Sequence, residues 1–390
     1  MSAAELAPRA ALDPDIEIVP VSGKADLDRF IRVPFALHAD DPNWVPPLLM
    51  ERHEALSPAK NPYFQHAEVQ MWIARRGGRD VGRISAQVDR LSLEAHKDQT
   101  GHFGMLAAED DPAVFAALLG TAEDWLRARG MRRVLGPFNL SINEEMGVLV
   151  EGFEKPPMLL MGHDRPYVSR RLEEQGYGKE KDVIAYLYDI AKELPPGPRA
   201  MLKRRLPEGV TLRTLSMKRY AEDIRALTEV FNDAWAGNWG FVPLTEAEIQ
   251  HMANAMKPLI DERLVWFVEV EGEPAAFGVC LPNINEAIRD LGGHLLPFGW
   301  AKLLWRLKVK GLKTARVPLM GVRRKYAGKW LGAVMPFLIV DGMRRGALER
   351  GYRQIELSWI LEDNKPMRAM IEAIESRGYK TYRIYGKALP

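Results

Sequence analysis

The chain carries the same order of sequence features twice, and this repetition limits its possible folds more than any other property. Gly130 and Gly351 each end a similar helical pattern, and Asn143 and Asn364 follow them at equal distances. Two further similarities keep the same order: Leu172–Tyr177 with Ile374–Tyr379, and Asn43–Leu48 with Asn238–Leu244. Such ordered self-similarity indicates an internal duplication. A chain of 390 residues accommodates two domains of roughly 180 residues each.

Proline and basic residues interrupt all periodicity at 191–209, which predicts a linker there. We therefore expect a disordered tail at 1–15, a first domain at 16–190 and a second domain at 210–390. The first copy carries extra residues within 147–165. The expected strands are 16–21, 68–75, 81–88, 101–107, 132–138, 183–188, 210–214, 265–271, 275–281, 315–322, 354–360 and 380–385; the expected helices are 112–129, 168–175, 333–350 and 365–377, with C-caps at Gly130, Gly176, Gly351 and Gly378. This order predicts an α+β fold in which each half is a mostly antiparallel mixed sheet flanked by helices.

Composition excludes several classes of function. A formal net charge of +2 gives no global sign of nucleic-acid binding. The single Cys280 cannot form an intramolecular disulfide or a cysteine-based zinc site, and no metal-ligand spacing, GxSxG or P-loop motif is present. The acidic, Ala/Pro-rich start does not resemble a signal peptide, and no window reaches the ~18 apolar residues of a membrane span. We expect a cytoplasmic protein with no metal.

One basic, glycine-containing loop, 323–332, lies between an expected strand and a long apolar helix. Such a loop directs backbone N–H groups and the positive end of the helix dipole at one point, which suits a pyrophosphate. A solvated basic turn is the alternative interpretation. The corresponding loop of the first copy, 107–112, carries three carboxylates that would repel a pyrophosphate. Only the second domain is therefore expected to bind the phosphate-bearing molecule.

The element order, with a glycine loop after the fourth strand and an Asn after the fifth, resembles the GNAT superfamily of acyl-CoA-dependent N-acyltransferases. In that family the loop reads Gln or Arg, two residues, Gly, one residue, then Gly or Ala. Here Gly332 matches the last position, whereas Ala327 and Trp330 replace the leading Arg and the central Gly. The resemblance implies acyl-CoA as a co-substrate and no tightly bound cofactor. The residues that would hold it are Val322, Arg323, Arg324, Lys325, Gly328, Lys329, Leu331, Gly332 and Asn364.

Two further stretches, 136–145 and 61–64, resemble a bacterial group of tandem acyltransferases that includes the bacterial ceramide synthases. That resemblance implies transfer of a long-chain acyl group from acyl-CoA to the amine of a sphingoid base. One rival function is an acetyl- or aminoacyl-transferase acting on another amine. A second rival is a non-catalytic protein that senses CoA or scaffolds partners, which the unusual Trp330 would favour.

Amide formation from a thioester needs a group that removes the amine proton and a donor to the leaving thiolate. Glu356 shares one face of its strand with Ser358 and is a candidate base. Glu144 adjoins Glu145, and adjacent carboxylates can raise one pKa. His163 lies in the insertion of the first copy, and Tyr326 could protonate a thiolate. The alternatives are a salt-bridged Glu356, solvated loop acids, a structural histidine and a packed tyrosine.

The segment 297–313 places Trp300, Leu303, Leu304 and Leu307 at helical spacing, among basic residues and no acid. Basic, Trp-bearing amphipathic helices lie in the plane of an anionic bilayer surface, here the inner membrane. A buried helix with a solvated basic edge is the alternative. The aromatic residues Phe231, Trp235, Trp239 and Phe241 could line an acyl tunnel or form core.

Overall fold

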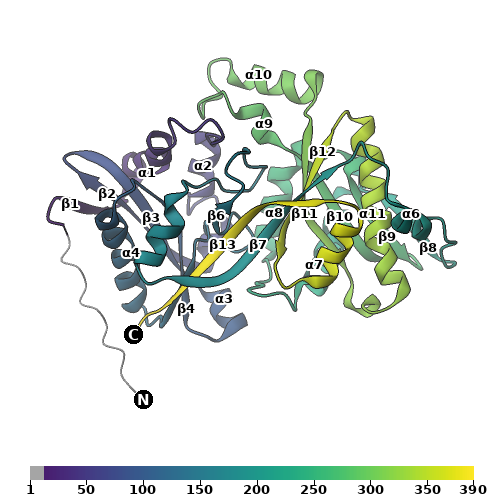
Figure 1. Ribbon diagram of the computed structural model, residues 1–390, viewed down its shortest axis with the longest axis horizontal. Helices are drawn as coiled ribbons and strands as arrows, with labels where there is room; N and C mark the ends of the chain where they lie inside the picture. The colour runs from purple at the N-terminus through teal and green to yellow at the C-terminus, as the bar shows by residue number, and fades with distance from the viewer. Residues whose placement is uncertain (1–12) are drawn as a thin grey trace.

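The computed structural model describes residues 13–390, so residues 1–12 of the expected tail lie outside the described residues. Within the described part, thirteen strands form one continuous sheet (Figure 1). The order along the sheet is β1-β2-β3-β4-β5-β13-β7-β12-β11-β10-β9-β8, and β6 pairs with β13 beside this path. The strands are β1 Ile16–Pro20, β2 Ala67–Arg76, β3 Arg79–Asp89, β4 Thr100–Ala108, β5 Arg133–Gly136, β6 Val148–Glu151, β7 Gly178–Asp189, β8 Val210–Thr214, β9 Val265–Val270, β10 Glu273–Pro282, β11 Thr314–Val322, β12 Gln354–Leu361 and β13 Arg377–Ala388.

The helices fall into two similar sets, one for each half. They are α1 Gly23–Leu37, α2 Leu49–Ala55, α3 Arg90–His96, α4 Pro112–Arg127, α5 Tyr167–Glu174, α6 Pro196–Leu202, α7 Tyr220–Trp235, α8 Glu246–Met256, α9 Ile284–Ile288, α10 Gly299–Trp305, α11 Trp330–Glu349 and α12 Lys365–Ala373, with 3₁₀ turns such as η3 Lys257–Leu259 and η6 Arg324–Tyr326 and a π turn η5 Arg306–Lys310. The expected mixed sheet with flanking helices is confirmed.

Alternation along the strands explains why helices cover both faces of the sheet. In β10, Phe277 and Val279 pack with Phe231 of α7, whereas Ala276 and Cys280 pack with α11 on the opposite face. Successive side chains of a strand point to opposite faces, so a strand that is apolar throughout must be covered on both sides. Strand β2 is enclosed in the same way between α1 and α4.

The two halves exchange their last strands. β13, from the second half, pairs antiparallel with β5 of the first half, while β7, from the first half, pairs antiparallel with β12 of the second. β7 and β13 also pair with each other along nearly their full length, in the middle of the molecule (Figure 1). The halves are therefore joined through main-chain hydrogen bonds as well as through the segment 191–209.

One expected helix end is wrong. Gly130, Gly176 and Gly351 take the left-handed conformation expected of C-cap glycines, with φ of 78°, 81° and 81°. Gly378, however, lies inside β13, because α12 already ends at Ala373 and Glu375 takes the positive φ of 58°. Helices α1, α7 and α8 and strand β6 are additions that the repeat pattern did not indicate. No helix among residues 13–390 is long and apolar enough to cross a bilayer.

Candidate active site

A groove opens where β11 and β12 separate. The two strands pair in parallel from Thr314–Gln354 to Val317–Leu357, and beyond this point β12 pairs only with β7. The groove has a volume of about 850 Å³ and is lined on one side by Val317–Arg324 and on the other by Leu357–Leu361 and α12. Beyond Val317, β11 thus pairs only with β10, and its other edge faces the groove without a strand partner, which suits an extended ligand that carries amides.

The loop after β11 ends at an uncapped helix. α11 starts at Trp330, and the N-cap residue Lys329 makes no side-chain capping hydrogen bond. The first N–H groups of a helix have no intrahelical acceptor, so the N–H groups at the start of α11 are available to bind an anion. A Cβ on Gly332 would lie 2.2 Å from the Tyr326 carbonyl oxygen, so only glycine allows this tight loop, and Gly328 has a φ of 71°.

The basic residues of the loop are largely engaged by acids. Arg323 pairs with Glu229 at 3.2 Å, Arg324 with Asp233 at 3.4 Å, and Lys325 with Glu273 at 3.1 Å. Lys329 has no ion-pair partner among the described residues. The backbone amides, together with Lys329, are consequently the strongest anion-binding groups of the loop.

The other expected cofactor residues divide between the groove and the core. Val322 and Asn364 line the groove, and Asn364 Oδ1 accepts a hydrogen bond from Met367 N at 3.2 Å, as an N-cap. Leu331 packs against the core of the second half, and the side chain of Lys325 does not line the groove. Tyr326 lies in η6 and lines the groove beside Gly332.

Glu356 lies at the point where the strands separate, fully buried. Its carboxylate accepts hydrogen bonds from the Ser358 hydroxyl and the Tyr379 hydroxyl, and Arg316 Nε lies 3.5 Å from Oε1. Both oxygens therefore already have donors. Ser358 also lines the groove, so it stands between the carboxylate and the groove.

Arg316 was not expected from the sequence. Its guanidinium is buried and donates to Ser358 Oγ at 2.8 Å and to the Leu159 carbonyl at 2.8 Å. Burial lowers the pKa of Arg316, and the nearby Glu356 opposes this shift. A single arginine within the apolar strand Ala315–Val322 was the available signal, because a buried charge needs a partner.

A second cavity, of about 420 Å³, lies between the two halves. It occupies the separation of β4 and β5, which pair in parallel only from Thr100–Arg133 to His102–Leu135. The first half thus repeats the geometry of the groove. Its phosphate end is closed, however, because the Asp111 side chain caps α4 by accepting from Ala113 N at 2.8 Å.

His163 lines this second cavity. Its Nε2 lies 3.0 Å from Asp41 Oδ2, and its buried Nδ1 has no hydrogen-bond partner. Because a carboxylate only accepts, Nε2 carries the proton and Nδ1 is left with a free lone pair. Burial lowers the pKa of His163, which keeps the ring neutral.

Glu144 lines neither the groove nor this cavity, although its neighbour Glu145 lines the cavity. Desolvation raises the pKa of Glu144 to about 8, and Glu145 adds to the rise. Asp164, in the cavity wall, has a pKa raised to about 7 by desolvation. The four expected catalytic residues are therefore not brought to one place: Glu356 and Tyr326 belong to the groove, His163 to the cavity, and Glu144 to neither.

The aromatic residues expected near the site are also divided. Phe231 packs on Trp235 with ring centroids 4.9 Å apart, and Trp235 lines the groove against Trp359 at 5.6 Å. Phe241 joins the same packed group. Trp239 instead borders a third, small cavity.

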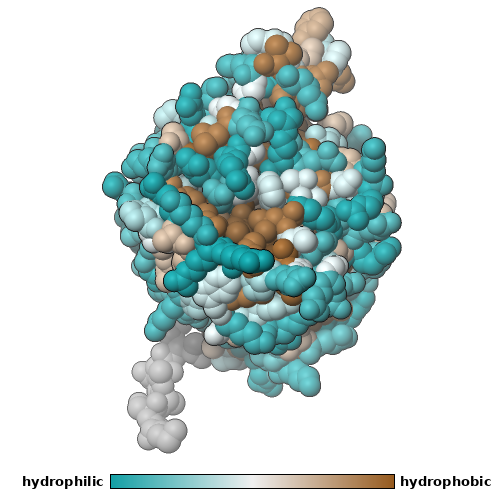
Figure 2. All heavy atoms as spheres, turned by 90° about the vertical axis from the view of Figure 1, so that its right-hand side faces the viewer, coloured by the Kyte–Doolittle hydropathy of each residue, from teal (hydrophilic) through white to brown (hydrophobic). Residues whose placement is uncertain are grey.

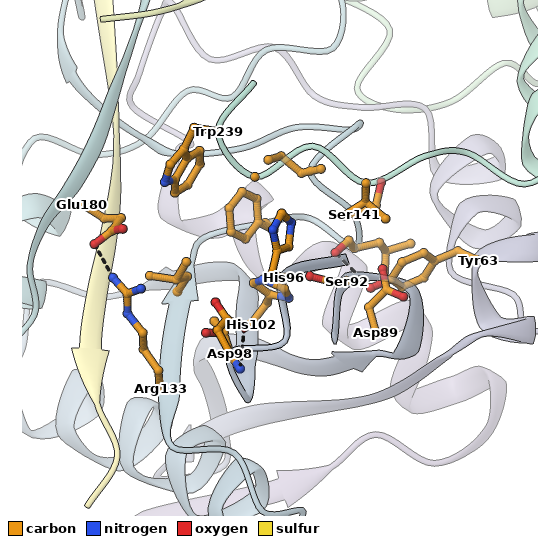
Figure 3. A pocket seen from close by; sticks show the side chains of 17 residues that line it. Tyr63, Asp89, Ser92, His96, Asp98, His102, Arg133, Ser141, Glu180 and Trp239 are labelled. Atoms are coloured by element: carbon orange, nitrogen blue, oxygen red, sulfur yellow. Dashed lines mark hydrogen bonds and ion pairs between the residues drawn. The ribbon is translucent and has the colours of Figure 1, made fainter. Parts of the chain in front are cut away.

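This third cavity, of about 130 Å³, lies beside α3 in the first half (Figure 3). Figure 3 shows Glu180 directed at Arg133, and His96, Asp98 and His102 gathered below Trp239. The volume is too small for a nucleotide or a lipid chain. Among residues 13–390, no group of His, Cys, Asp and Glu is placed to hold a metal ion.

Comparison with known proteins places these features in a family, although no family model matches the chain. It is 56% identical to the bacterial ceramide synthase of Caulobacter vibrioides over 96% of this chain and 98% of that protein. It is 46% identical to protein YghO of Escherichia coli over 94% of each chain.

Two solved structures show the same fold. A tandem GNAT protein from the clavulanic acid biosynthesis pathway superposes with a TM-score of 0.57 at 14% identity, over 96% of this chain and 99% of that chain. A GCN5-related N-acetyltransferase from Sphaerobacter thermophilus superposes with a TM-score of 0.51 at 13% identity, over 97% of both chains. The fold is therefore the tandem GNAT fold, and the chain belongs to the family of bacterial ceramide synthases.

Proposed function

We propose that this protein is an acyl-CoA-dependent N-acyltransferase that joins a long-chain acyl group to the amine of a sphingoid base, forming ceramide. The observation that carries the proposal is the groove between β11 and β12, which runs from the uncapped end of α11 to the buried Glu356–Ser358 pair. It rests also on the 56% identity to the bacterial ceramide synthase of Caulobacter vibrioides.

The loop residues divide the work of holding acyl-CoA. The backbone N–H groups at the start of α11 and the Lys329 ammonium bind the pyrophosphate, and Gly328 and Gly332 let the loop approach it closely. Val322, Arg323, Arg324, Lys325, Leu331 and Asn364 shape the loop and the groove around it. The unpaired side of β11 then accepts the pantetheine amides.

Ser358 and Glu356 are the groups best placed to take the proton that the amine loses on attack. The proton passes to Ser358 Oγ while the Ser358 hydroxyl proton passes to Glu356, and Arg316 keeps the carboxylate in position. The Tyr326 hydroxyl supplies a proton to the leaving thiolate of CoA. Glu144, whose pKa is raised to about 8, serves in its ionised form as a more distant proton acceptor.

The segment 297–313 is proposed to place the enzyme on the inner, cytoplasmic membrane surface. Apolar side chains stand exposed on it and at the preceding Leu296: Leu296 78%, Phe298 78%, Trp300 53%, Leu304 51%, Trp305 52% and Val309 71%. Figure 1 shows α10 projecting from the body, and Figure 2 shows hydrophobic side chains on the projecting tip at the top. Leu303 and Leu307 pack inward, so the helix presents one apolar face to the core and another to its surroundings.

The decisive experiment incubates purified protein with palmitoyl-CoA and a C18 sphingoid base and follows free CoA and ceramide by mass spectrometry. The expected result is equal release of both products. Preference for acetyl-CoA over palmitoyl-CoA would favour the rival acetyltransferase. Binding of acyl-CoA without any product would favour a CoA-sensing protein.

A further inference from the structure

The separation of β4 and β5 has lost the features that bind a phosphate but has kept its interior space. Asp111 caps α4, which begins at Pro112, and Glu109 and Asp110 pair with arginines of neighbouring elements. A cavity of about 420 Å³ nevertheless remains, within the range of sites for small organic ligands. A duplicated site without its phosphate end is suited to the other substrate of a two-substrate reaction.

The lining of this cavity is divided between a polar end and an apolar wall. The polar part of the lining comprises His38, Glu51, Arg52, Arg83, Asn139, Glu145, His163, Asp164 and Asn285. The apolar wall is larger and comes from both halves: Ile31, Pro34, Val45, Leu48, Leu56, Met105, Leu106, Met146, Pro157, Leu159, Met256, Leu259, Ile284 and Ile288. An amphiphile with one polar group and a hydrocarbon chain satisfies both parts.

One wall of the cavity adjoins the segment that carries the exposed apolar side chains. Glu51 of α2 and Ala255 of α8 are exposed residues of the lining, so the opening lies between these helices. Helix α9 forms part of the wall, and the carbonyl of its Ala287 accepts a hydrogen bond from Arg306 Nη1 at 2.6 Å, directly behind α10. On the other side, Leu49 N at the start of α2 donates to the Gly293 carbonyl at 3.0 Å, so α2 also contacts the chain that leads into α10.

The short segment 159–161 lies between this cavity and the groove, together with the side chains of Arg316 and Ser358. The Leu159 and Leu160 carbonyls accept hydrogen bonds from Arg316, and Met161 Sδ lies 3.7 Å from Ser358 Oγ in the groove wall. Leu160 has a φ of 59°, a costly conformation for a branched side chain. The partition is thus thin, and its main-chain part belongs to the insertion found only in the first copy.

We propose that the cavity between the halves binds the long-chain amine acceptor, with its hydrocarbon chain on the apolar wall and its amine beside His163. This inference rests on the proposed function and assigns its acceptor site. The amine reaches the thioester as its neutral free base, past the segment 159–161. It loses one proton on attack to Ser358 Oγ, and the Ser358 hydroxyl proton passes to Glu356.

The test narrows the opening of the cavity without touching its polar end. Ala255→Trp adds a large side chain at the opening, and Asn254→Trp adds the same side chain to the exposed neighbouring position on α8 as a matched control. Steady-state kinetics are measured separately against a C18 sphingoid base and against palmitoyl-CoA. We expect the KM for the base to rise at least tenfold in Ala255→Trp, with the KM for palmitoyl-CoA within twofold of wild type, and no change in Asn254→Trp.

A second measurement locates the ligand directly. A sphingoid base with a diazirine at the end of its chain is photolysed on the wild-type protein, and the crosslinked peptides are identified by mass spectrometry. Crosslinks within 44–56, 255–259 or 284–288 support the site. Crosslinks confined to the β11–β12 groove would overturn the proposal, because the base would then bind outside the cavity. A rise in the KM for palmitoyl-CoA alone would also overturn it, because the cavity would then hold the acyl chain. If wild-type protein forms no ceramide but crosslinks in the cavity, the proposed function fails while the binding site stands.

Discussion

Membrane attachment through 297–313 gives a quantitative prediction, because the structure separates its paired from its unpaired cations. Lys302 and Arg306 both pair with Asp290, at 2.7 Å for Lys302. Lys308, Lys310 and Lys313 are exposed and have no ion-pair partner in the described chain. Each lysine near an anionic bilayer contributes about 1 kcal/mol.

The triple variant Lys308→Gln, Lys310→Gln, Lys313→Gln should therefore lose about 3 kcal/mol of binding free energy, or roughly a 100-fold weaker partition onto vesicles rich in anionic lipid. Cosedimentation with vesicles containing 30% phosphatidylglycerol, at about 0.1 M salt, measures the partition. The matched control changes three exposed lysines elsewhere: Lys24, Lys203 and Lys218.

Lys302→Gln should weaken partition less than any single change within the triple variant, because Asp290 already offsets that charge. Higher salt should reduce the difference between the wild type and the triple variant, since the attraction is screened. Equal partition of the triple variant and its control, or equal binding of wild type to neutral vesicles, would refute the electrostatic reasoning and leave the exposed apolar residues without this role.

Three other predictions concern the interior. Gly332→Val should weaken palmitoyl-CoA binding by roughly 10- to 100-fold, because the added side chain meets the Tyr326 carbonyl oxygen and displaces backbone amides, whose hydrogen bonds to a charged group are worth about 1.5–3 kcal/mol. Calorimetry measures the affinity, with Gly178→Ala as the control, and an unchanged affinity would argue against the loop as the pyrophosphate site. Arg316→Met should lower the free energy of unfolding by about 3–5 kcal/mol, because it leaves Glu356 buried without its cation, and adding Glu356→Gln should recover part of this loss. Urea denaturation of both variants measures the free energies, and an unchanged stability of Arg316→Met would contradict the pairing. Desolvation raises the pKa of Asp164 to about 7, so the protonated carboxyl stabilises the fold fully below pH 3.8 and this contribution is lost as the pH rises through 7. Asp164→Asn should therefore be more stable than the wild type at pH 8, and its free energy of unfolding should depend less on pH. Parallel pH profiles for the two proteins would show that Asp164 does not cause this dependence.

The strands and the helices that the two halves repeat were largely predictable, since alternation and helix ends are local signals, whereas α1 and α7 were not predicted. β8 begins and ends at the predicted residues, and the strands on either side of the groove, β11 and β12, each differ from expectation by one residue. The exchange of β7 and β13 was not predictable, because the residue pattern of each strand is equally compatible with pairing to β5 or to β12. The misplaced C-cap at Gly378 has the same origin: glycine permits a helix end, but here the pairing of β13 with β7 determines its conformation.

The loop at 323–332 was identified from its composition, and the structure brings it to the groove. Composition did not reveal that acids on other elements engage Arg323, Arg324 and Lys325, because Glu229, Asp233 and Glu273 are distant in sequence. The cavity between the halves was missed for a related reason. Its wall combines α2, α8, α9 and the insertion of the first copy, and no single segment carries a signal of it.

The exchange of final strands has a consequence for biosynthesis. β13 lies between β5 and β7 in the sheet and is the last strand to be translated. β5 and β7 are synthesised earlier, so the edge of each that pairs with β13 stays unpaired until translation ends. The amino-terminal half therefore leaves the ribosome with open edges, which invite pairing with other nascent chains. Splitting the gene at the linker would yield two polypeptides that recover a native sheet only by finding each other.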